Sequence, residues 1–215
     1  FVYETDGGNI DSLFDSFRRL LGIGFIKPRP VAQNFYARRS DLTPRSRSLA
    51  LDNEVLPFNA RSRKSHESEK WVGHEVVLDV FPDVIAYGIL LLPRDLKANE
   101  QRPVVVCQHG LEGRPQDIIE GDHYAYHDFA AKLAERGFIT FSPQNMYIFR
   151  DRFRTLQRKA NPLKKSMFSV IIPQHQQIVD WLKTLPYVDK ERIAFYGLSY
   201  GGKTAMRVPP GATVF

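Results

Sequence analysis

From residue 71 onward, apolar and polar positions follow the periods of strands and helices. The segments "WVGHEVVLDVF" (71–81) and "IAYGILLLP" (85–93) predict two strands, and the "PD" between them is a turn signal. Three shorter runs are apolar almost throughout, which is typical of strands buried on both faces: "RPVVVCQHG" (102–110), "FITFSP" (138–143) and "RIAFYG" (192–197).

Helical spacing of apolar residues appears between these strands. One such stretch is 126–137, where Gly137 is a natural helix stop. Another is 175–185. The helix that contains it either has Pro173 in its first turn or begins near Phe168 and is kinked at Pro173. A further helix is expected directly after Gly197. Strands that alternate with helices after an initial hairpin predict an α/β protein, a three-layer α/β/α sandwich with a mostly parallel sheet.

The first 70 residues have a different pattern. "NIDSLFDSFRRLLGIGF" (9–25) predicts one amphipathic helix, and a polar, proline-interrupted stretch follows it. We therefore divide the chain into an N-terminal helix with an extended arm, residues 1–70, and an α/β domain, residues 71–215. The arm carries no pattern that indicates chemistry.

Composition adds few constraints. Apolar residues make up 43% and charged residues 25% of the 215 positions, as in ordinary globular proteins, and the single cysteine, Cys107, lies in an apolar run that predicts a buried thiol. Much of the net charge of +6 comes from one basic segment, 150–165, which we expect to be a solvated face or loop, with attraction of an acidic substrate or surface as the alternative.

Several classes of partner are not indicated. No nucleic-acid motif accompanies the basic segment, and the longest apolar runs are far shorter than the roughly 20 residues of a membrane span. We expect no cofactor. The chain begins at Phe1 without a signal-like segment, so the sequence leaves the compartment open.

The strongest chemical signal is "GLSYG", residues 197–201, which matches G-x-S-x-G between an apolar strand and a helix-competent stretch. Such a tight strand-to-helix turn exposes the serine hydroxyl, and glycine is needed at Gly197, Gly201 and the following Gly202 because the backbones pass closely. We interpret Ser199 as a nucleophile; the alternative is a glycine-rich turn with Ser199 as a helix cap.

A nucleophile that attacks a carbonyl needs donors for the oxyanion. The backbone amide of Tyr200, directly after the serine, is the first candidate. The second is the amide of Leu111 in the loop "QHGLEG", which follows the third predicted strand and contains His109 and Gly110. We expect His109 to brace this loop rather than act as a base.

The order of strand hairpin, "VVVCQHGLEG", helix, "ITFSPQN", helix and "RIAFYGLSYGG" resembles the α/β-hydrolase fold up to its nucleophile elbow. The segment "DWLKTLPYVDKERIAFYGLSYGG" is similar to the sequences of the dienelactone-hydrolase and acetyl-xylan-esterase-like branch, and the similarity covers about residues 71–206. The resemblance implies hydrolysis of a small-molecule carboxylic ester through an acyl-enzyme. A non-catalytic binding scaffold and, further behind, a serine peptidase are the alternatives.

This resemblance also implies an acid and a histidine after the elbow, yet "KTAMRVPPGATVF" contains neither. The earlier histidines do not sit where the fold places its base: His66, His74, His109, His123, His127 and His175. His175 shares the apolar helix face, and His123 and His127 are spaced for one helical face without a third metal ligand, so we expect no metal site.

We therefore expect a chain that holds the N-terminal half of the fold and lacks the triad acid and base. The strand before Ser199 would be left with an unpaired edge, which a second copy of the chain or a continuing polypeptide would have to cover.

Overall fold

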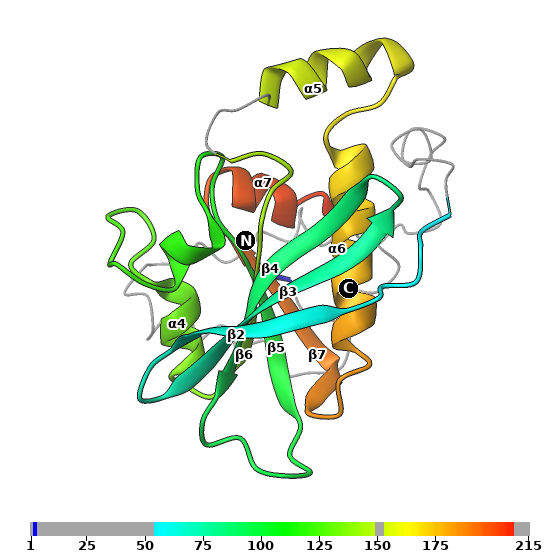
Figure 1. Ribbon diagram of the computed structural model, residues 1–215. Helices are drawn as coiled ribbons and strands as arrows, with labels where there is room; N and C mark the ends of the chain where they lie inside the picture. Colours follow the sequence, from blue (N-terminus) through cyan, green and yellow to red (C-terminus); the bar gives the residue numbers. More distant parts are fainter. Residues whose placement is uncertain (1, 4–53, 149–152, 209–215) are drawn as a thin grey trace, which may run out of the picture.

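The computed structural model describes residues 2–3, 54–148 and 153–208. Its core is a seven-stranded sheet with the order β1-β7-β5-β6-β4-β3-β2 (Figure 1). The strands are β1 (Val2–Tyr3), β2 (Arg61–Glu67), β3 (Trp71–Phe81), β4 (Val84–Pro93), β5 (Arg102–Gln108), β6 (Ile139–Pro143) and β7 (Val188–Gly197). The helices are η2 (Pro115–Ile118), α4 (Phe129–Ala134), α5 (Phe153–Ala160), η3 (Asn161–Leu163), α6 (Phe168–Leu182) and α7 (Tyr200–Ala205).

The sheet is mixed. Strand β5 runs parallel to β6 and to β7, whereas β1, β2, β3 and β4 pair antiparallel with their neighbours. The predicted fold class, with helices on both sides of a sheet opened by an antiparallel hairpin, is confirmed. Parallel pairing within the described sheet is confined to its centre.

Two apolar clusters fill the two faces of the sheet because neighbouring strand residues point in opposite directions. On β5, Val104 and Val106 belong to the cluster under α6 and α7, whereas Val105 and Cys107 belong to the cluster under α4 and η2. Helices α4 and α6 accordingly lie on opposite sides of the sheet in Figure 1. The thiol of Cys107 is buried, as predicted, and burial raises its pKa.

Helix α6 packs its apolar side on the sheet. It begins at Phe168 and contains Pro173 in its interior, so the start expected for the longer of the two alternative helices is confirmed. His175 lies in its buried side, 3% exposed, as the helical spacing predicted. None of the helices in the described part of the chain combines the length and the apolar character of a membrane span.

The helix expected over 126–137 is shorter than its spacing suggested. Residues 124–128 form turns, because Asp122, His127 and Asp128 have φ values of 44°, 49° and 49°, which a right-handed helix excludes. Helix α4 therefore starts at Phe129, and His123 and His127 do not share a helical face.

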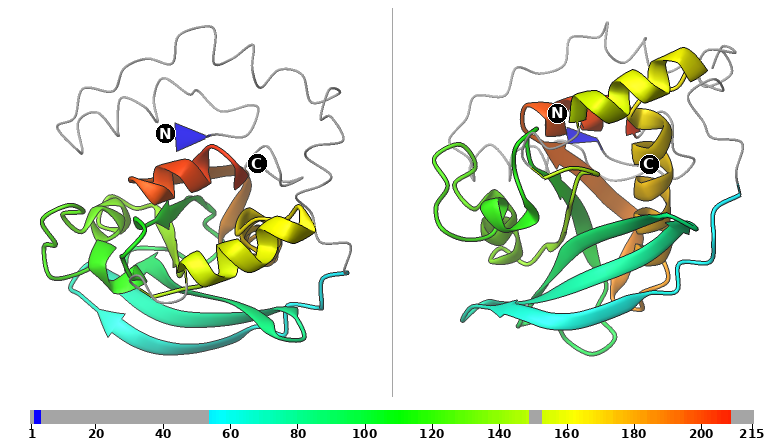
Figure 2. Two further views of the ribbon diagram at one scale, coloured as in Figure 1. Left: turned by 90° about the horizontal axis from the view of Figure 1, so that it is seen from above. Right: turned by 45° about the horizontal axis from the view of Figure 1, so that its top comes forward.

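The N-terminal 70 residues contribute to the sheet at two places. Residues 61–67, assigned to the extended arm, form the outer strand β2 against β3, at the side of the sheet far from α7 (Figure 2). Strand β1 pairs with Tyr196 and Phe195 of β7, so the edge expected to be unpaired is covered there by the N-terminal segment. The helix predicted over 9–25 lies outside the described residues.

The basic segment is partly described. Its residues 153–163 form α5 and η3, which lie apart from the sheet (Figure 1), and Arg154, Arg158, Lys159 and Lys164 are exposed. This is the solvated face that we expected.

Candidate active site

A sharp bend joins β7 to α7 at Ser199. The strand ends at Gly197, the helix begins at Tyr200, and Ser199 between them has φ 57° and ψ −115°. A serine with this backbone conformation is strained, and such strain persists where the surrounding structure enforces it. The bend has the geometry that the G-x-S-x-G pattern predicted.

The glycines around the bend are required by close backbone contact. A Cβ placed on Gly197 would overlap the backbone of Gly201, and one placed on Gly201 would overlap the carbonyl oxygen of Gln108. Gly202 is less crowded, since its Cβ would lie 3.3 Å from the Gly197 carbonyl oxygen. The first two positions thus exclude any side chain.

The same contacts bring the loop after β5 against the elbow. The amide of Leu198 donates to the carbonyl of Gln108 at 3.4 Å, and a Cβ on Gly110 would lie 3.5 Å from the Cβ of Ser199. The amide of Leu111 makes no hydrogen bond to another described residue. Ser199 and the loop that carries Leu111 are therefore neighbours, which an oxyanion hole requires.

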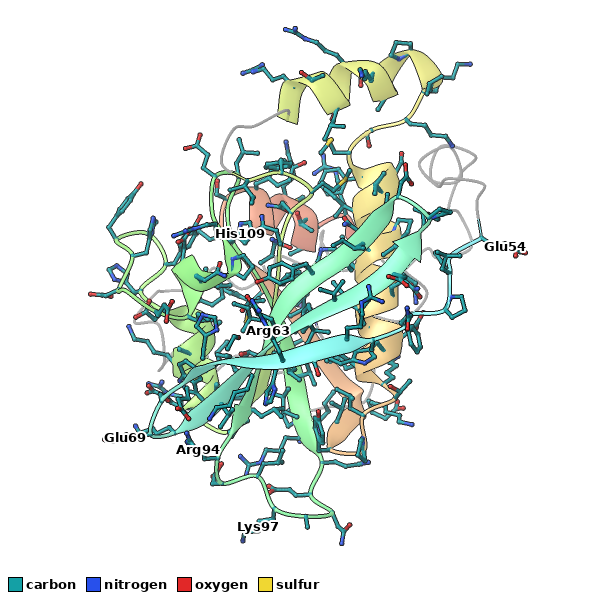
Figure 3. The ribbon with its side chains drawn as sticks, viewed as in Figure 1. Glu54, Arg63, Glu69, Arg94, Lys97 and His109 are labelled. Carbon is teal, nitrogen blue, oxygen red and sulfur yellow. The ribbon has the colours of Figure 1, made fainter. Side chains whose placement is uncertain are left out.

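His109, the first residue of this loop, is fully buried in the region of α7 (Figure 3). Its Nδ1 lies 2.7 Å from the carbonyl oxygen of Gly110, and burial lowers its pKa to about 4. Since a carbonyl can only accept, Nδ1 carries the proton and the ring is neutral near pH 7. The ring is thus held against the backbone of the loop, and the role expected for His109 stays a prediction.

Two further side chains hold Gly110, and no pattern in the sequence indicates either of them. The hydroxyl of Tyr126 accepts a hydrogen bond from the Gly110 amide at 2.9 Å, and Nδ2 of Asn145 donates to the Gly110 carbonyl at 3.4 Å. They come from the turn before α4 and from the segment after β6. The residues next to Tyr126 and Asn145 in the sequence contain no pattern that predicts contacts between such distant parts of a chain.

The side chain of Tyr200 belongs to an aromatic cluster. Its ring stacks on Phe168 with centroids 5.9 Å apart and meets Tyr147 edge-on at 6.1 Å. The ammonium group of Lys203 lies 5.5 Å from the centre of the Tyr200 ring. Burial raises the pKa of both Tyr147 and Tyr200, so both phenols are neutral at physiological pH. The cluster anchors the residue that follows Ser199.

Three of the other histidines contact an aromatic ring or a carboxylate. His175 packs against Phe195 with ring centroids 5.2 Å apart, and burial lowers its pKa to about 3. His127 pairs with Asp122 at 3.1 Å on the surface, and His66 lies 3.6 Å from Glu120. Among the described residues, no hydrogen bond links Ser199 to a histidine, and no group of three or more acidic, histidine or cysteine residues could hold a metal ion.

Comparison with known proteins identifies the family. The model of the dienelactone hydrolase family matches residues 92–214, more than half of the sequence, and the chain belongs to this family. No curated protein matches the sequence.

Solved structures agree on the fold. The chain is similar to an acetyl xylan esterase, described as putative in its structure's name, from Bacteroides fragilis (TM-score 0.68, 16% identity, 85% of this chain and 52% of that one). It is also similar to an acetyl xylan esterase from Paenibacillus sp. R4 (TM-score 0.59, 17% identity, 84% of this chain and 55% of that one). A third similar structure is the acetyl xylan esterase 1 from Thermoanaerobacterium sp. JW/SL YS485 (TM-score 0.58, 15% identity, 76% of this chain and 52% of that one). The chain spans about half the length of these proteins.

Proposed function

We propose that this chain supplies the nucleophile and the oxyanion hole of a serine hydrolase that cleaves carboxylic esters through an acyl-enzyme. The observation that carries the proposal is the strained bend at Ser199 packed against the Gly110 loop. Membership of the dienelactone hydrolase family supports hydrolysis, and the structurally similar acetyl xylan esterases favour a small acyl group such as acetate.

In the proposed reaction, the Ser199 hydroxyl oxygen attacks the ester carbonyl carbon and a histidine takes the serine proton. The carbonyl electrons move onto the oxygen, which the amides of Leu111 and Tyr200 stabilise. The C–O bond to the alcohol then breaks as the alcohol receives the proton. Attack by water on the acyl-serine releases the carboxylic acid and restores Ser199.

The general base and its acid are assigned to parts of the protein other than the described residues. His109 is unsuited to the role because its Nδ1 is bonded to Gly110 and burial lowers its pKa to about 4. His175 is unsuited because it lies on the buried side of α6, between the helix and the sheet. The absence of a suitable base among the described residues also favours the second candidate, a non-catalytic scaffold that has the same fold and binds a ligand.

The test uses Ser199→Ala in the full-length protein, with p-nitrophenyl acetate as substrate. We expect a loss of at least about 10³-fold in kcat, since removing a triad member removes the acyl-enzyme route. The matched control is Ser65→Ala, which changes an exposed serine on β2 and should keep full turnover. Unchanged hydrolysis in Ser199→Ala would contradict the proposal. Failure of a fluorophosphonate to label Ser199 in the unmodified protein would favour the scaffold.

A further inference from the structure

The carbonyl group of Gly110 is held by three donors. Nδ1 of His109 approaches its oxygen to 2.7 Å, whereas the amide of Gly113 and Nδ2 of Asn145 lie at 3.3 Å and 3.4 Å. Hydrogen bonds in proteins weaken as the donor–acceptor distance passes about 3.2 Å. His109 therefore provides the main restraint on this oxygen.

Restraining this oxygen also sets the direction of a neighbouring amide. The Gly110 carbonyl and the Leu111 N–H belong to one planar trans peptide unit, in which the two bonds point in opposite directions. A carbonyl that is turned toward His109, Gly113 and Asn145 turns the Leu111 N–H away from all three. That N–H makes no hydrogen bond to a described residue, and the adjoining Gly110 lies against Ser199.

The peptide unit before Gly110 is restrained as well. Its N–H donates to the hydroxyl of Tyr126 at 2.9 Å, and a Cβ on Gly110 would come within 2.7 Å of that hydroxyl oxygen. Gly113 is packed as closely, since a Cβ there would lie 2.9 Å from the Cβ of His109. The backbone of the loop therefore cannot easily adopt another orientation.

The surroundings of His109 keep it a donor. Its Nε2 is buried and has no hydrogen-bond partner among the described residues, so Nδ1–H to Gly110 is the one polar contact that this part of the chain gives the ring. A protonated imidazole would bury an uncompensated charge, which explains why the pKa falls to about 4. The donor state persists across the neutral range.

We propose that His109, assisted by Asn145, is a positioning residue of the reaction: it turns the Leu111 amide toward the oxyanion by holding the Gly110 carbonyl. This inference rests on the proposed function, because it assigns a role to the same site. It goes beyond bracing of the loop, since it predicts an effect on one step of the reaction, the stabilisation of the oxyanion.

The experiment compares His109→Leu with His109→Asn in the full-length protein. Leucine removes the donor, whereas the side-chain nitrogen of asparagine can take the place of Nδ1 and keep it. We expect kcat for p-nitrophenyl acetate to fall about ten- to hundredfold in His109→Leu with little change in KM, below the 10²–10³-fold cost of deleting an oxyanion donor. His109→Asn should recover most of the activity.

Turnover of a thionoester of the same alcohol provides a second measurement. The ratio of oxygen-ester to thionoester turnover would not change if His109 had only a structural role. Sulfur accepts hydrogen bonds poorly, so an ordered oxyanion hole favours the oxygen ester. His109→Leu should lower the ratio of oxygen-ester to thionoester turnover about tenfold, because most of the lost oxyanion stabilisation applies to oxygen alone. Should His109→Leu fail to fold, Asn145→Leu takes its place, with a smaller loss in the same direction.

The control is His175→Leu, which replaces an equally buried histidine away from the loop and should leave the ratio unchanged. A normal ratio and normal kcat in folded His109→Leu would overturn the inference. Loss of activity that His109→Asn fails to recover would overturn it too. If Ser199→Ala retains turnover, the proposed function fails instead, and the two results are thus distinguishable.

Discussion

At the scale of single residues, Gly201 has the least room for change. A Cβ there would overlap the Gln108 carbonyl oxygen and lie 2.8 Å from that of His109, and both oxygens belong to backbone that cannot rotate away. We expect Gly201→Ala to lower the free energy of unfolding by about 3 kcal/mol and to abolish ester hydrolysis, because relief of the clash separates Ser199 from the loop.

Urea unfolding of the two proteins measures this cost, and Gly202→Ala is the control. Its Cβ would be 3.3 Å from the nearest atom, so a loss of about 1 kcal/mol or less is expected. Equal stability of the two alanine variants would show that the close approach at Gly201 is not required.

The same residue scale shows what the sequence can and cannot specify. Crowding at Gly197 arises within five consecutive residues, because a Cβ there would overlap the backbone of Gly201, so the G-x-S-x-G pattern predicted the bend. Crowding at Gly201 comes from the distant carbonyls of Gln108 and His109. Tyr126 and Asn145 reach Gly110 from 16 and 35 positions away, and nothing in their neighbouring residues signals these contacts. The roles of Ser199, Leu111 and Tyr200 in catalysis stay predictions.

At the scale of elements, periodic segments were predictable and polar ones were not. Strand β2 was missed because nearly all of its residues are exposed, so it has no alternation of apolar positions. It is joined to β3 by ion pairs, Arg61 with Asp79 at 2.6 Å and Arg63 with Glu75 at 2.5 Å. Such a charged outer strand also discourages pairing with other chains.

Two buried glutamines tie helix α6 to its neighbours: Gln174 donates to the carbonyl of Ile85 in β4, and Gln177 is 3% exposed. Its amide nitrogen donates to the carbonyls of Leu56 and Asp79 at 2.6 Å and 2.8 Å. We expect Gln177→Met to lower the free energy of unfolding by about 1–3 kcal/mol, because it leaves two carbonyls without this donor while volume is nearly kept.

Chemical denaturation measures that difference against Gln176→Met on the same helix. Gln176 bonds Asp180 one turn along, at 2.9 Å, and such pairs contribute about 0.5 kcal/mol or less. A Gln177→Met protein no less stable than Gln176→Met would rule out the tie between α6 and the segment before β2.

At the scale of the whole molecule, the alternation of strands and helices predicted the layers. The order of the strands in the sheet could not be predicted from the sequence. Strand β4 pairs antiparallel with β6 rather than with its successor β5, and β1 lies beside β7 from the other end of the sequence. These pairings depend on contacts across about 50 residues or more, which local patterns do not encode.

Stability of the whole molecule should fall in mild acid because His109 and His175 are buried as neutral rings. Their folded-state pKa values are about 4 and about 3, against 6.5 for a free histidine. Below pH 6.5 the unfolded chain therefore binds protons that the folded chain cannot, so the stability present above pH 6.5 is lost as the pH falls toward 4 and 3.

His175→Gln isolates the share of one ring, since glutamine does not titrate. Between pH 7 and pH 5, linkage predicts that each buried histidine lowers the free energy of unfolding by about 2 kcal/mol. The decrease in His175→Gln should therefore be about 2 kcal/mol smaller than in the unmodified protein. Urea unfolding at the two pH values measures both losses. An identical loss in His175→Gln would mean that His175 takes up its proton in the folded protein, and that the packing of α6 over Phe195 opens to water in mild acid.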